Sequence, residues 1–225
     1  MRIMNDENTM PVVRMARERF TELWKAHTLA ACQPDSGDVY GVLWIRYNED
    51  HRHYHTPAHI DFCLAQFDLA RHQIDDADAV EMAIWFHDLI YDPGALDNEQ
   101  QSAERFVQLA KGYLDPVFVE SVCKLIVATI PGRTPEGQDE EFVVDIDFSS
   151  FASPWHEFKR DCRALRDECV HLTDASFHAA QMKFYQSLLA RSSLYYTPFF
   201  RERMEQTAIE NIGRYMEELR AKGIQ

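Results

Sequence analysis

The chain has 225 residues, enough for one large or two small domains, and carries a formal net charge of −14 with its histidines neutral. No segment rich in Pro, Gly and Ser divides it, so we expect a single domain spanning residues 1–225. The acidic excess would repel an extended phosphate backbone or an anionic membrane surface, so we expect neither a nucleic-acid polymer nor a membrane as partner.

Apolar residues recur at spacings of three and four along most of the chain, and strict alternation of apolar and polar residues persists nowhere. This periodicity predicts an all-α protein, a single helical bundle. The first two helices are expected at residues 12–31 and 39–47. Thr56-Pro57 is expected to open a third, because Thr suits the N-cap and Pro suits the first helical position.

The start of this third helix separates two histidines. His59 falls in its first turn, whereas His55 lies just before it. The two side chains therefore do not share a helix face, although they are four residues apart, and we expect them to have different roles.

A fourth helix is expected to begin at the acidic residues 75–78 and to continue through His87-Asp88. Its helical period places Ala83, Ile84 and His87 on the inward face, with Asp88 about 100° around the axis. An imidazole beside a carboxylate in an apolar stretch is costly unless something binds the pair. A divalent metal ion is the obvious candidate.

The second half of the chain is predicted to be helical with two interruptions. A turn is expected at 92–95, and the polar segment 131–137, with two prolines and two glycines, is a candidate mobile lid. We expect the metal-site core within about residues 40–150 and a scaffold role for 151–225, as core or as the face of a homodimer. The later helices are predicted at 98–110, 117–129, 155–172, 175–190 and 199–219.

Cysteine usage and the N-terminal segment indicate the same compartment. The five cysteines, an odd number, form no C-x-x-C pair, which is typical of free, mostly buried thiols in a reducing environment. Residues 1–8 lack the apolar core of a signal peptide, and no later stretch is apolar for long enough to span a bilayer. The sequence therefore predicts a cytoplasmic protein.

Three short motifs occur in a fixed order: Tyr54-His55 with His59, then Phe86-His87-Asp88-Leu89, then Asp145-Ile146-Asp147-Phe148. Together they resemble the HD-domain superfamily of metal-dependent phosphohydrolases, and within it a bacterial group of predicted phosphohydrolases, over about residues 40–150. The resemblance implies an all-helical fold. It also implies hydrolysis of a small phosphorylated substrate, with a nucleotide as one candidate.

The spacing His55-Thr-Pro-Ala-His59 is also similar to a segment of cyclic-nucleotide phosphodiesterases, in which the second histidine binds metal and the first protonates the leaving oxygen. By this resemblance His59, His87 and Asp88 are metal ligands, and Asp88 is counted among the catalytic residues. His55 is then the general acid or a substrate contact. The reverse assignment, with His55 as the metal ligand, stays open.

For the last ligand, the resemblance favours Asp147, with Asp145 as the alternative. Whichever of the two does not bind metal is expected to be a carboxylate at a helix N-terminus, where the helix dipole favours it. Glu99 is a candidate catalytic residue that orients water or an imidazole, or else an exposed capping residue after Asn98.

Imidazole nitrogens and carboxylate oxygens together suit Mn, Mg, Fe, Co, Ni or Zn, so the sequence predicts one divalent ion of open identity. Such an ion keeps positions open for water and stabilises charge on a phosphoryl group under attack. No histidine occurs between Asp88 and Trp155, an interval in which di-iron oxygenases and dinuclear phosphodiesterases of the superfamily use additional histidines. A single ion is therefore favoured, and an iron oxygenase or a non-catalytic nucleotide sensor remains the alternative.

Four further residues are candidate substrate contacts. His51 and Arg52 precede the first motif, and Arg52 would hold a phosphate through bidentate hydrogen bonds, although a mixed-charge run such as 49–52 is also typical of a solvated loop. Tyr91 follows the His-Asp pair by one helical turn. The end of a helix at this point would explain a tyrosine here equally well. Arg133 lies on the polar loop.

Overall fold

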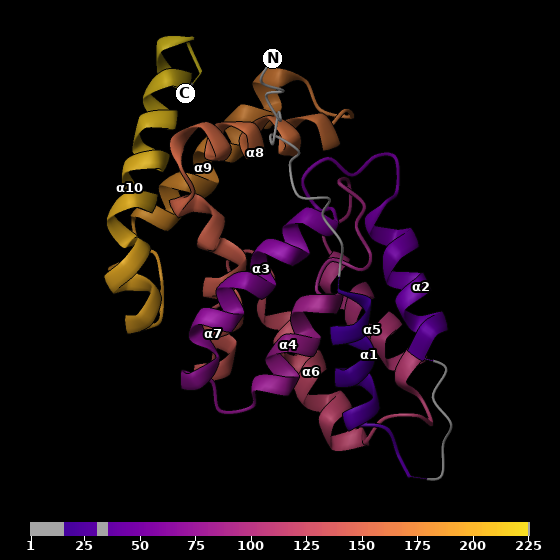
Figure 1. Cartoon of the computed structure of the whole chain (residues 1–225). Helices are drawn as coiled ribbons and strands as arrows, with labels where there is room; N and C mark the ends of the chain where they lie inside the picture. The colour runs from indigo at the N-terminus through magenta and orange to yellow at the C-terminus, as the bar shows by residue number, and fades with distance from the viewer. Residues whose placement is uncertain (1–15, 31–35, 225) are drawn as a thin grey trace, which may run out of the picture.

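The computed structural model describes residues 16–30 and 36–224, and over these residues the protein is all-α, which confirms the predicted fold class (Figure 1). Within the same ranges β pairing is limited to an isolated antiparallel bridge between Thr28 and Leu114. The elements are α1 (Arg17–Ala26), α2 (Ser36–Tyr47), α3 (Pro57–Ala70), η1 (Arg71–Gln73), α4 (Ala77–Phe86), α5 (Asn98–Ala110), α6 (Pro116–Ala128), α7 (Gln138–Phe148), η2 (Ser149–Ala152), α8 (Trp155–Glu168), α9 (Asp174–Leu189) and α10 (Pro198–Ala221).

Helix α4 is the centre of the first seven helices. Every residue from Ala79 to Phe86 is buried, and α4 contacts α1, α3, α5, α6 and α7. A helix that is apolar on all sides requires neighbours on all sides, which explains this arrangement. Asp76 caps its N-terminus by accepting a hydrogen bond from the Ala79 N–H, and the buried carboxylate of Glu81 pairs with Arg19 of α1 at 2.7 Å.

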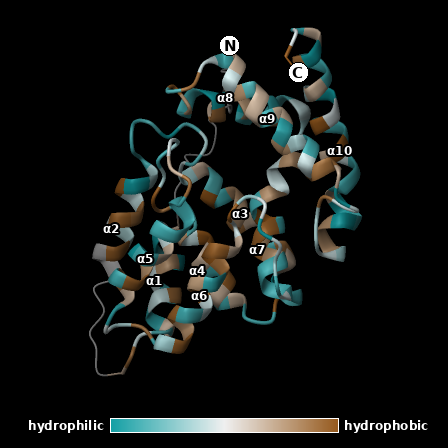
Figure 2. Cartoon of the chain, turned by 180° about the vertical axis from the view of Figure 1, so that it is seen from behind, coloured by the Kyte–Doolittle hydropathy of each residue, from teal (hydrophilic) through white to brown (hydrophobic). Residues whose placement is uncertain are grey.

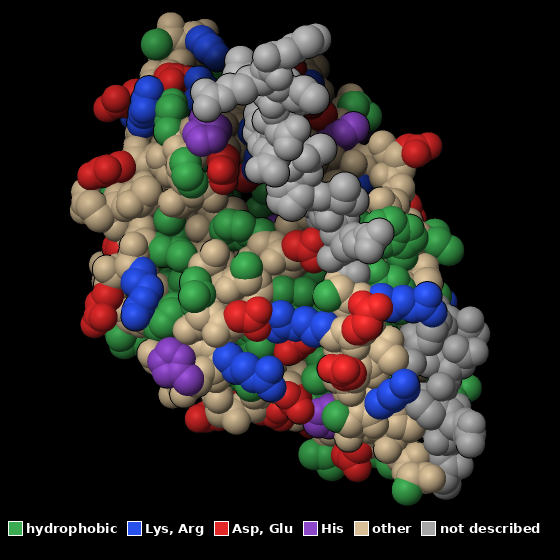
Figure 3. Space-filling model, in the orientation of Figure 1, with side chains coloured by type: hydrophobic (Ala, Val, Ile, Leu, Met, Phe, Trp, Pro, Cys, Tyr) green, Lys and Arg blue, Asp and Glu red, His purple; other side chains and the backbone are tan. Residues whose placement is uncertain are grey.

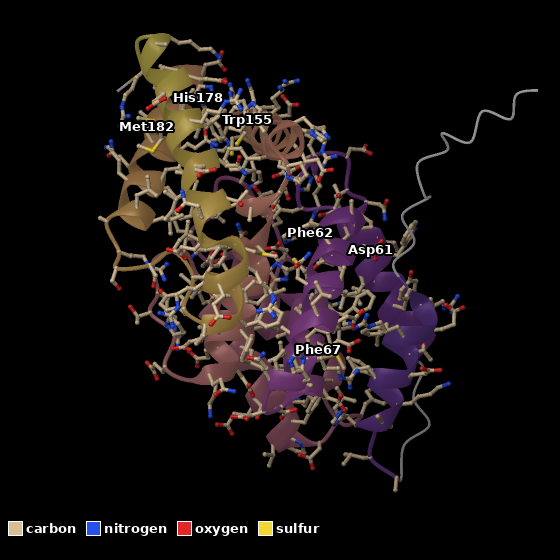
Figure 4. All side chains as sticks on the ribbon, turned by 60° about the vertical axis from the view of Figure 1, so that its left-hand side comes forward. Asp61, Phe62, Phe67, Trp155, His178 and Met182 are labelled. Carbon is tan, nitrogen blue, oxygen red and sulfur yellow. The ribbon has the colours of Figure 1, made fainter. Side chains whose placement is uncertain are left out.

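Helices α8, α9 and α10 lie beside this first group (Figure 1). Phe67 on α3 and Met182 on α9 mark the two parts in Figure 4, and both side chains are buried. The amide of Asn211 on α10 donates hydrogen bonds to the carbonyls of Phe151 and Ser153, at 2.9 and 2.8 Å, and so attaches α10 to the segment after α7. Apolar residues concentrate around α4 and α6 in the middle of the bundle, whereas the loops are mostly hydrophilic (Figure 2).

Most predicted helices agree with the structure to within a few residues. Pro57 is the first residue of α3, and α5 spans Asn98–Ala110 as expected. The first predicted helix is shorter than expected, at Arg17–Ala26, and its predicted residues 12–15 and 31 lie outside the described ranges. The fourth ends one residue before His87 instead of continuing through it.

The surface carries charges of both signs. Arg19 pairs with Asp68 at 2.7 Å as well as with Glu81, and Arg71 pairs with Asp78 at 3.2 Å. Figure 3 shows Lys and Arg side chains interspersed with Asp and Glu on this face. Arginine side chains paired with acidic side chains therefore offset part of the negative charge in this region.

The four cysteines within the described ranges are unpaired thiols, as predicted. Cys63 and Cys162 are buried, Cys123 and Cys169 are partly buried, and Cys32 lies outside the described residues. Among the described helices, none combines the length and the apolar character needed to cross a membrane.

Candidate metal centre

Three helices bring together four side chains of the types that can bind a metal ion. His59 lies in the first turn of α3, His87 and Asp88 follow the last residue of α4, and Asp147 lies in the last turn of α7. Each of these helices contacts the other two. Residues that are far apart in the sequence therefore meet at one point.

His87 has a defined orientation although it lies outside the regular helix. Its backbone N–H still bonds to the Ala83 carbonyl at 2.9 Å, and its ring Nδ1 lies 3.0 Å from the Ile84 carbonyl oxygen. A carbonyl only accepts hydrogen bonds, so Nδ1 carries the proton. The lone pair of Nε2 is thereby left for a cation.

The potential ligand atoms lie at short mutual distances. His87 Nε2 is 2.9 Å from Asp88 Oδ2, and His59 Nε2 is 3.2 Å from Asp147 Oδ1 and 3.3 Å from His87 Nε2. The distance from His59 Nε2 to Asp88 Oδ2 is 3.5 Å, and that from His87 Nε2 to Asp147 Oδ1 is 3.6 Å. Two atoms that each lie about 2.1 Å from one cation are separated by about 3.0 Å at a right angle and about 3.4 Å at the tetrahedral angle. Each of these five distances is therefore close to that expected for two ligands of one cation. The groups with metal-binding spacing are His59, His87 and Asp88, and His59, Cys63 and Asp147.

The electrostatics of the cluster also favour a cation. Burial alone would lower the pKa of His87, but the carboxylates of Asp88 and Asp147 outweigh burial and hold that pKa well above its ordinary value. Burial alone would raise the pKa of each carboxyl, yet the imidazoles hold the pKa of Asp88 far below its usual range and lower the pKa of Asp147 to about 2. The two carboxylates thus stabilise positive charge between them, which a divalent cation supplies.

His55 is held by a buried carboxylate from the C-terminal part of the chain. Glu168, the last residue of α8, accepts hydrogen bonds through Oε1 from the consecutive backbone N–H groups of residues 53–55, at 2.8, 2.7 and 2.9 Å. Its Oε2 lies 2.7 Å from His55 Nδ1. This contact fixes the proton on Nδ1 and leaves Nε2 of His55 for other partners.

The pairing shifts the pKa of both groups. Burial alone would lower the pKa of His55, but the Asp88 and Glu168 carboxylates outweigh it and raise that pKa. Burial alone would raise the pKa of Glu168, but the His55 ring and the backbone N–H groups lower it to about 2. The pair therefore favours an imidazolium beside a carboxylate.

Asp145 lies in the same helix as Asp147 but has different partners. Its carboxylate accepts hydrogen bonds from the backbone N–H groups of Tyr196 and Thr197, at 2.8 and 2.7 Å, and from the Thr197 hydroxyl at 2.7 Å. It thus attaches α7 to the start of α10. The expectation of a carboxylate at a helix N-terminus is wrong, because α7 begins at Gln138 and Asp145 lies in its C-terminal half.

A cavity of about 440 Å³ opens onto the cluster. His55, His87, Asp88 and Asp147 line it, as does Glu99 from the first turn of α5. Burial raises the pKa of Glu99. Much of the remaining wall is apolar and comes from the end of α7, from η2, from α8 and α9, and from the loop between these two helices: Phe148, Phe151, Leu165, Leu172, Phe177 and Phe184.

The buried guanidinium of Arg52 is occupied by the backbone. It donates hydrogen bonds to the carbonyls of Asp88 and Leu89, at 2.7 and 3.0 Å, and to the carboxylate of Glu49 at 3.1 Å. The side chain is fully buried and Arg52 does not line the cavity. Its position supports the loop that presents the His-Asp pair.

The other predicted substrate contacts, Tyr91, His51 and Arg133, have different surroundings. The Tyr91 ring is centred 4.0 Å from the His55 ring, so these two residues are in contact. His51 is partly exposed, with its Nε2 3.0 Å from the Tyr91 carbonyl oxygen, and it does not line the cavity. Arg133 lines a neighbouring cavity of about 460 Å³.

Sequence reasoning did not find two residues at the site. Cys63 lies one turn after His59 in α3, with its Sγ 3.7 Å from His59 Nε2, and the four-residue spacing was a usable signal. Burial raises the pKa of Cys63 well above its ordinary value, so it is present as a thiol. Glu168 is 113 positions from His55, and no local pattern connects them.

Comparisons of the chain with protein-family models, with curated proteins and with solved structures found no match. The geometry and chemistry of the site are therefore the basis for assigning a function.

Proposed function

We propose that the protein is a metal-dependent phosphohydrolase that acts on a small phosphorylated molecule. The observation that carries this proposal is the convergence of ligand atoms from α3, α4 and α7 at one cavity that His55 also lines. The motif order, which resembles the HD-domain superfamily, adds support. The ligands are His59, His87, Asp88 and Asp147.

The donor set of two imidazole nitrogens and two carboxylate oxygens suits one divalent ion among Mn, Mg, Fe, Co, Ni and Zn. When bound, such an ion supplies Lewis acidity, which draws electron density from a phosphoryl oxygen and makes water more acidic. The hydrogen bond between the His87 ring and the Ile84 carbonyl keeps the ligand nitrogen in position.

Two residues of the chain handle protons in the proposed reaction. Water attacks phosphorus as the bond from phosphorus to the leaving oxygen breaks, and that oxygen takes a proton from Nε2 of His55. The raised pKa of His55 and its pairing with Glu168 keep this imidazole protonated for the task. The carboxylate of Glu99, which lines the same cavity, accepts the proton that water loses.

Two other functions fit the site less well. A sensor with a structural metal would have a closed set of ligands, whereas Asp88 and Asp147 face a cavity with room for substrate. A dinuclear oxygenase needs a second set of ligands. Among the described residues, both groups with metal-binding spacing include His59, so neither provides a second set of ligands separate from the first.

The test uses purified protein with Mn or with a chelator, and measures phosphate released from a panel of phosphate monoesters and diesters together with the metal content. We expect His87→Ala and Asp147→Ala to lose both metal and turnover. His156→Ala, which removes an exposed histidine that does not line the cavity, serves as the matched control and should keep both. Release that persists in His87→Ala, or metal binding without turnover of any ester, would contradict the proposal.

A further inference from the structure

We propose that the substrate carries a single phosphate and an apolar organic group about the size of a bicyclic aromatic ring system. The inference rests on the proposed function, because it concerns the cavity of the same site. It specifies the substrate class that a metal centre alone leaves open.

Aromatic side chains form the part of the cavity wall that lies beyond the metal ligands. The rings of Phe148 and Phe151 are centred 5.4 Å apart, and Phe184 lies 6.1 Å from Phe148 and 6.4 Å from Phe151. All three side chains are only partly buried and line the cavity. Binding is favourable when an apolar ligand covers apolar side chains that are exposed in a concave site, because their surface is removed from water.

Several polar groups of this wall already have hydrogen-bond partners within the protein. The Gln181 amide nitrogen lies 3.3 Å from the Tyr185 hydroxyl, and its amide oxygen lies 3.2 Å from His178 Nδ1 (His178 is labelled in Figure 4). The Tyr54 hydroxyl and Ser150 hydroxyl lie 2.9 Å apart. These contacts use part of the hydrogen-bonding capacity of the wall, so the wall has less of it to offer the polar edge of a base or a sugar.

The charges in the cavity match one phosphate. Three carboxylates line it, those of Asp88, Glu99 and Asp147, and no Lys or Arg is among its lining residues. A divalent ion offsets two of these negative charges and accommodates one phosphate. Apart from the ion and the His55 imidazolium, which serve the first phosphate, a second phosphate would meet no Lys or Arg in this cavity, because Arg133 and Arg191 line the neighbouring one.

The first test compares esters whose leaving alcohols are similarly acidic, so that reactivity does not bias the result. We expect kcat/KM in Mn for 2-(1-naphthyl)ethyl phosphate to exceed that for ethyl phosphate by about 100-fold. The corresponding naphthylethyl diphosphate should be turned over at least about tenfold less well than the monophosphate. Equal values for the naphthylethyl and ethyl esters, or a preference for the diphosphate, would overturn the inference.

The second test fills the cavity. Ala180 on α9 lines the cavity, and a phenyl group there would occupy space rather than remove packing. We expect Ala180→Phe to reduce the naphthylethyl-to-ethyl preference about tenfold. Ala175→Phe, on an exposed position of the same helix outside the cavity, is the matched control and should leave the preference unchanged. A preference that survives in Ala180→Phe would contradict the proposed position of the organic group.

A binding measurement separates this inference from the proposed function. Calorimetry in Mn with 2-(1-naphthyl)ethylphosphonate and ethylphosphonate, which lack the scissile ester bond, needs no turnover. If no ester is hydrolysed but the naphthylethyl compound binds at least about tenfold more tightly, and Ala180→Phe removes the difference, the hydrolase fails and the apolar site stands. If esters are hydrolysed without such a difference, the hydrolase stands and the apolar site fails.

Discussion

At the scale of single residues, the contact between Glu168 and His55 has the clearest functional consequence. The Glu168 carboxylate contacts the His55 imidazole and also accepts hydrogen bonds from the backbone N–H groups of residues 53–55. A partner of this kind determines which ring nitrogen faces the cavity and how readily the ring is protonated. In the proposed reaction Glu168 is therefore a positioning residue, since it would act through His55.

We predict that Glu168→Gln lowers kcat by about 10–100-fold while metal content stays unchanged. The amide cannot stabilise the imidazolium, so the basic limb of the pH–rate profile should move to lower pH as the His55 pKa falls. Phosphate-release kinetics across pH and metal analysis measure these effects. Glu157→Gln, a partly exposed change on α8, is the control. A fall in kcat with an unmoved profile would indicate a purely structural role.

The lowered pKa of Glu168 also predicts a pH dependence of stability. Its folded pKa is about 2 and its ordinary value is 4.5, so the stabilisation is fully present above about pH 4.5 and is lost as pH falls towards 2. Chemical denaturation of the wild type and Glu168→Gln should show a difference of at least about 2 kcal/mol at pH 7 that narrows across this window. A difference that stays constant from pH 7 to pH 3 would count against the pairing.

At the scale of elements, the two carboxylates of α7 have separate roles. Asp145 holds the start of α10 through Tyr196 and Thr197, whereas Asp147 faces His59 and His87. They are two residues apart and so point in different directions around the helix. One helix thus serves both the C-terminal packing and the metal centre.

This division predicts different phenotypes for two similar changes. Asp145→Asn replaces an acceptor oxygen with an amide group that faces backbone N–H donors, and we expect a loss of about 1–3 kcal/mol in the free energy of unfolding with metal binding retained. Asp147→Asn should weaken metal binding, and because the imidazoles lower the pKa of Asp147 to about 2, it should also cost the metal-free protein about 1–2 kcal/mol. Denaturant titration and metal analysis of both variants test this, and reversed effects on metal binding would exchange the two assignments.

The starts of the helices were predictable because their causes are local. Thr56-Pro57 and the acidic residues around Asp76 mark starts within a few positions of the observed ones. The end of α4 was not predictable, because the contacts that determine it involve residues outside the helix. Arg52 binds the carbonyls of Asp88 and Leu89, and the Asp92 N–H donates to the Asn98 side chain instead of a helical carbonyl.

The same distinction applies to the site. The sequence named all four clustered side chains, since each belongs to a short motif whose order is informative. The partners that give His55 and Asp145 their environments lie in α8 and before α10, 113 and 51 positions away. Periodicity and capping carry no information about such pairings, which packing of the C-terminal helices decides.

At the scale of the whole molecule, the ligands come from three helices around the core, so a bound ion should stabilise the entire fold. With Mn at about 100 times its Kd, we expect a gain of about 2.7 kcal/mol and a rise in Tm of about 5–10 °C. Thermal unfolding with Mn and with chelator measures this. His87→Ala should lose the rise and His156→Ala should keep it, and an equal rise in both variants would place the ion elsewhere.

The positions of the ligands along the chain have a consequence during translation. A polypeptide is synthesised from its N-terminus to its C-terminus. A nascent chain that extends to Gly137 already contains His59, His87 and Asp88 but lacks Asp147. Glu168, which orients His55, is made later still. A ribosome-bound intermediate therefore lacks one of the proposed ligands. We expect full affinity for an ion only after α7 has been synthesised and has docked against α3 and α4.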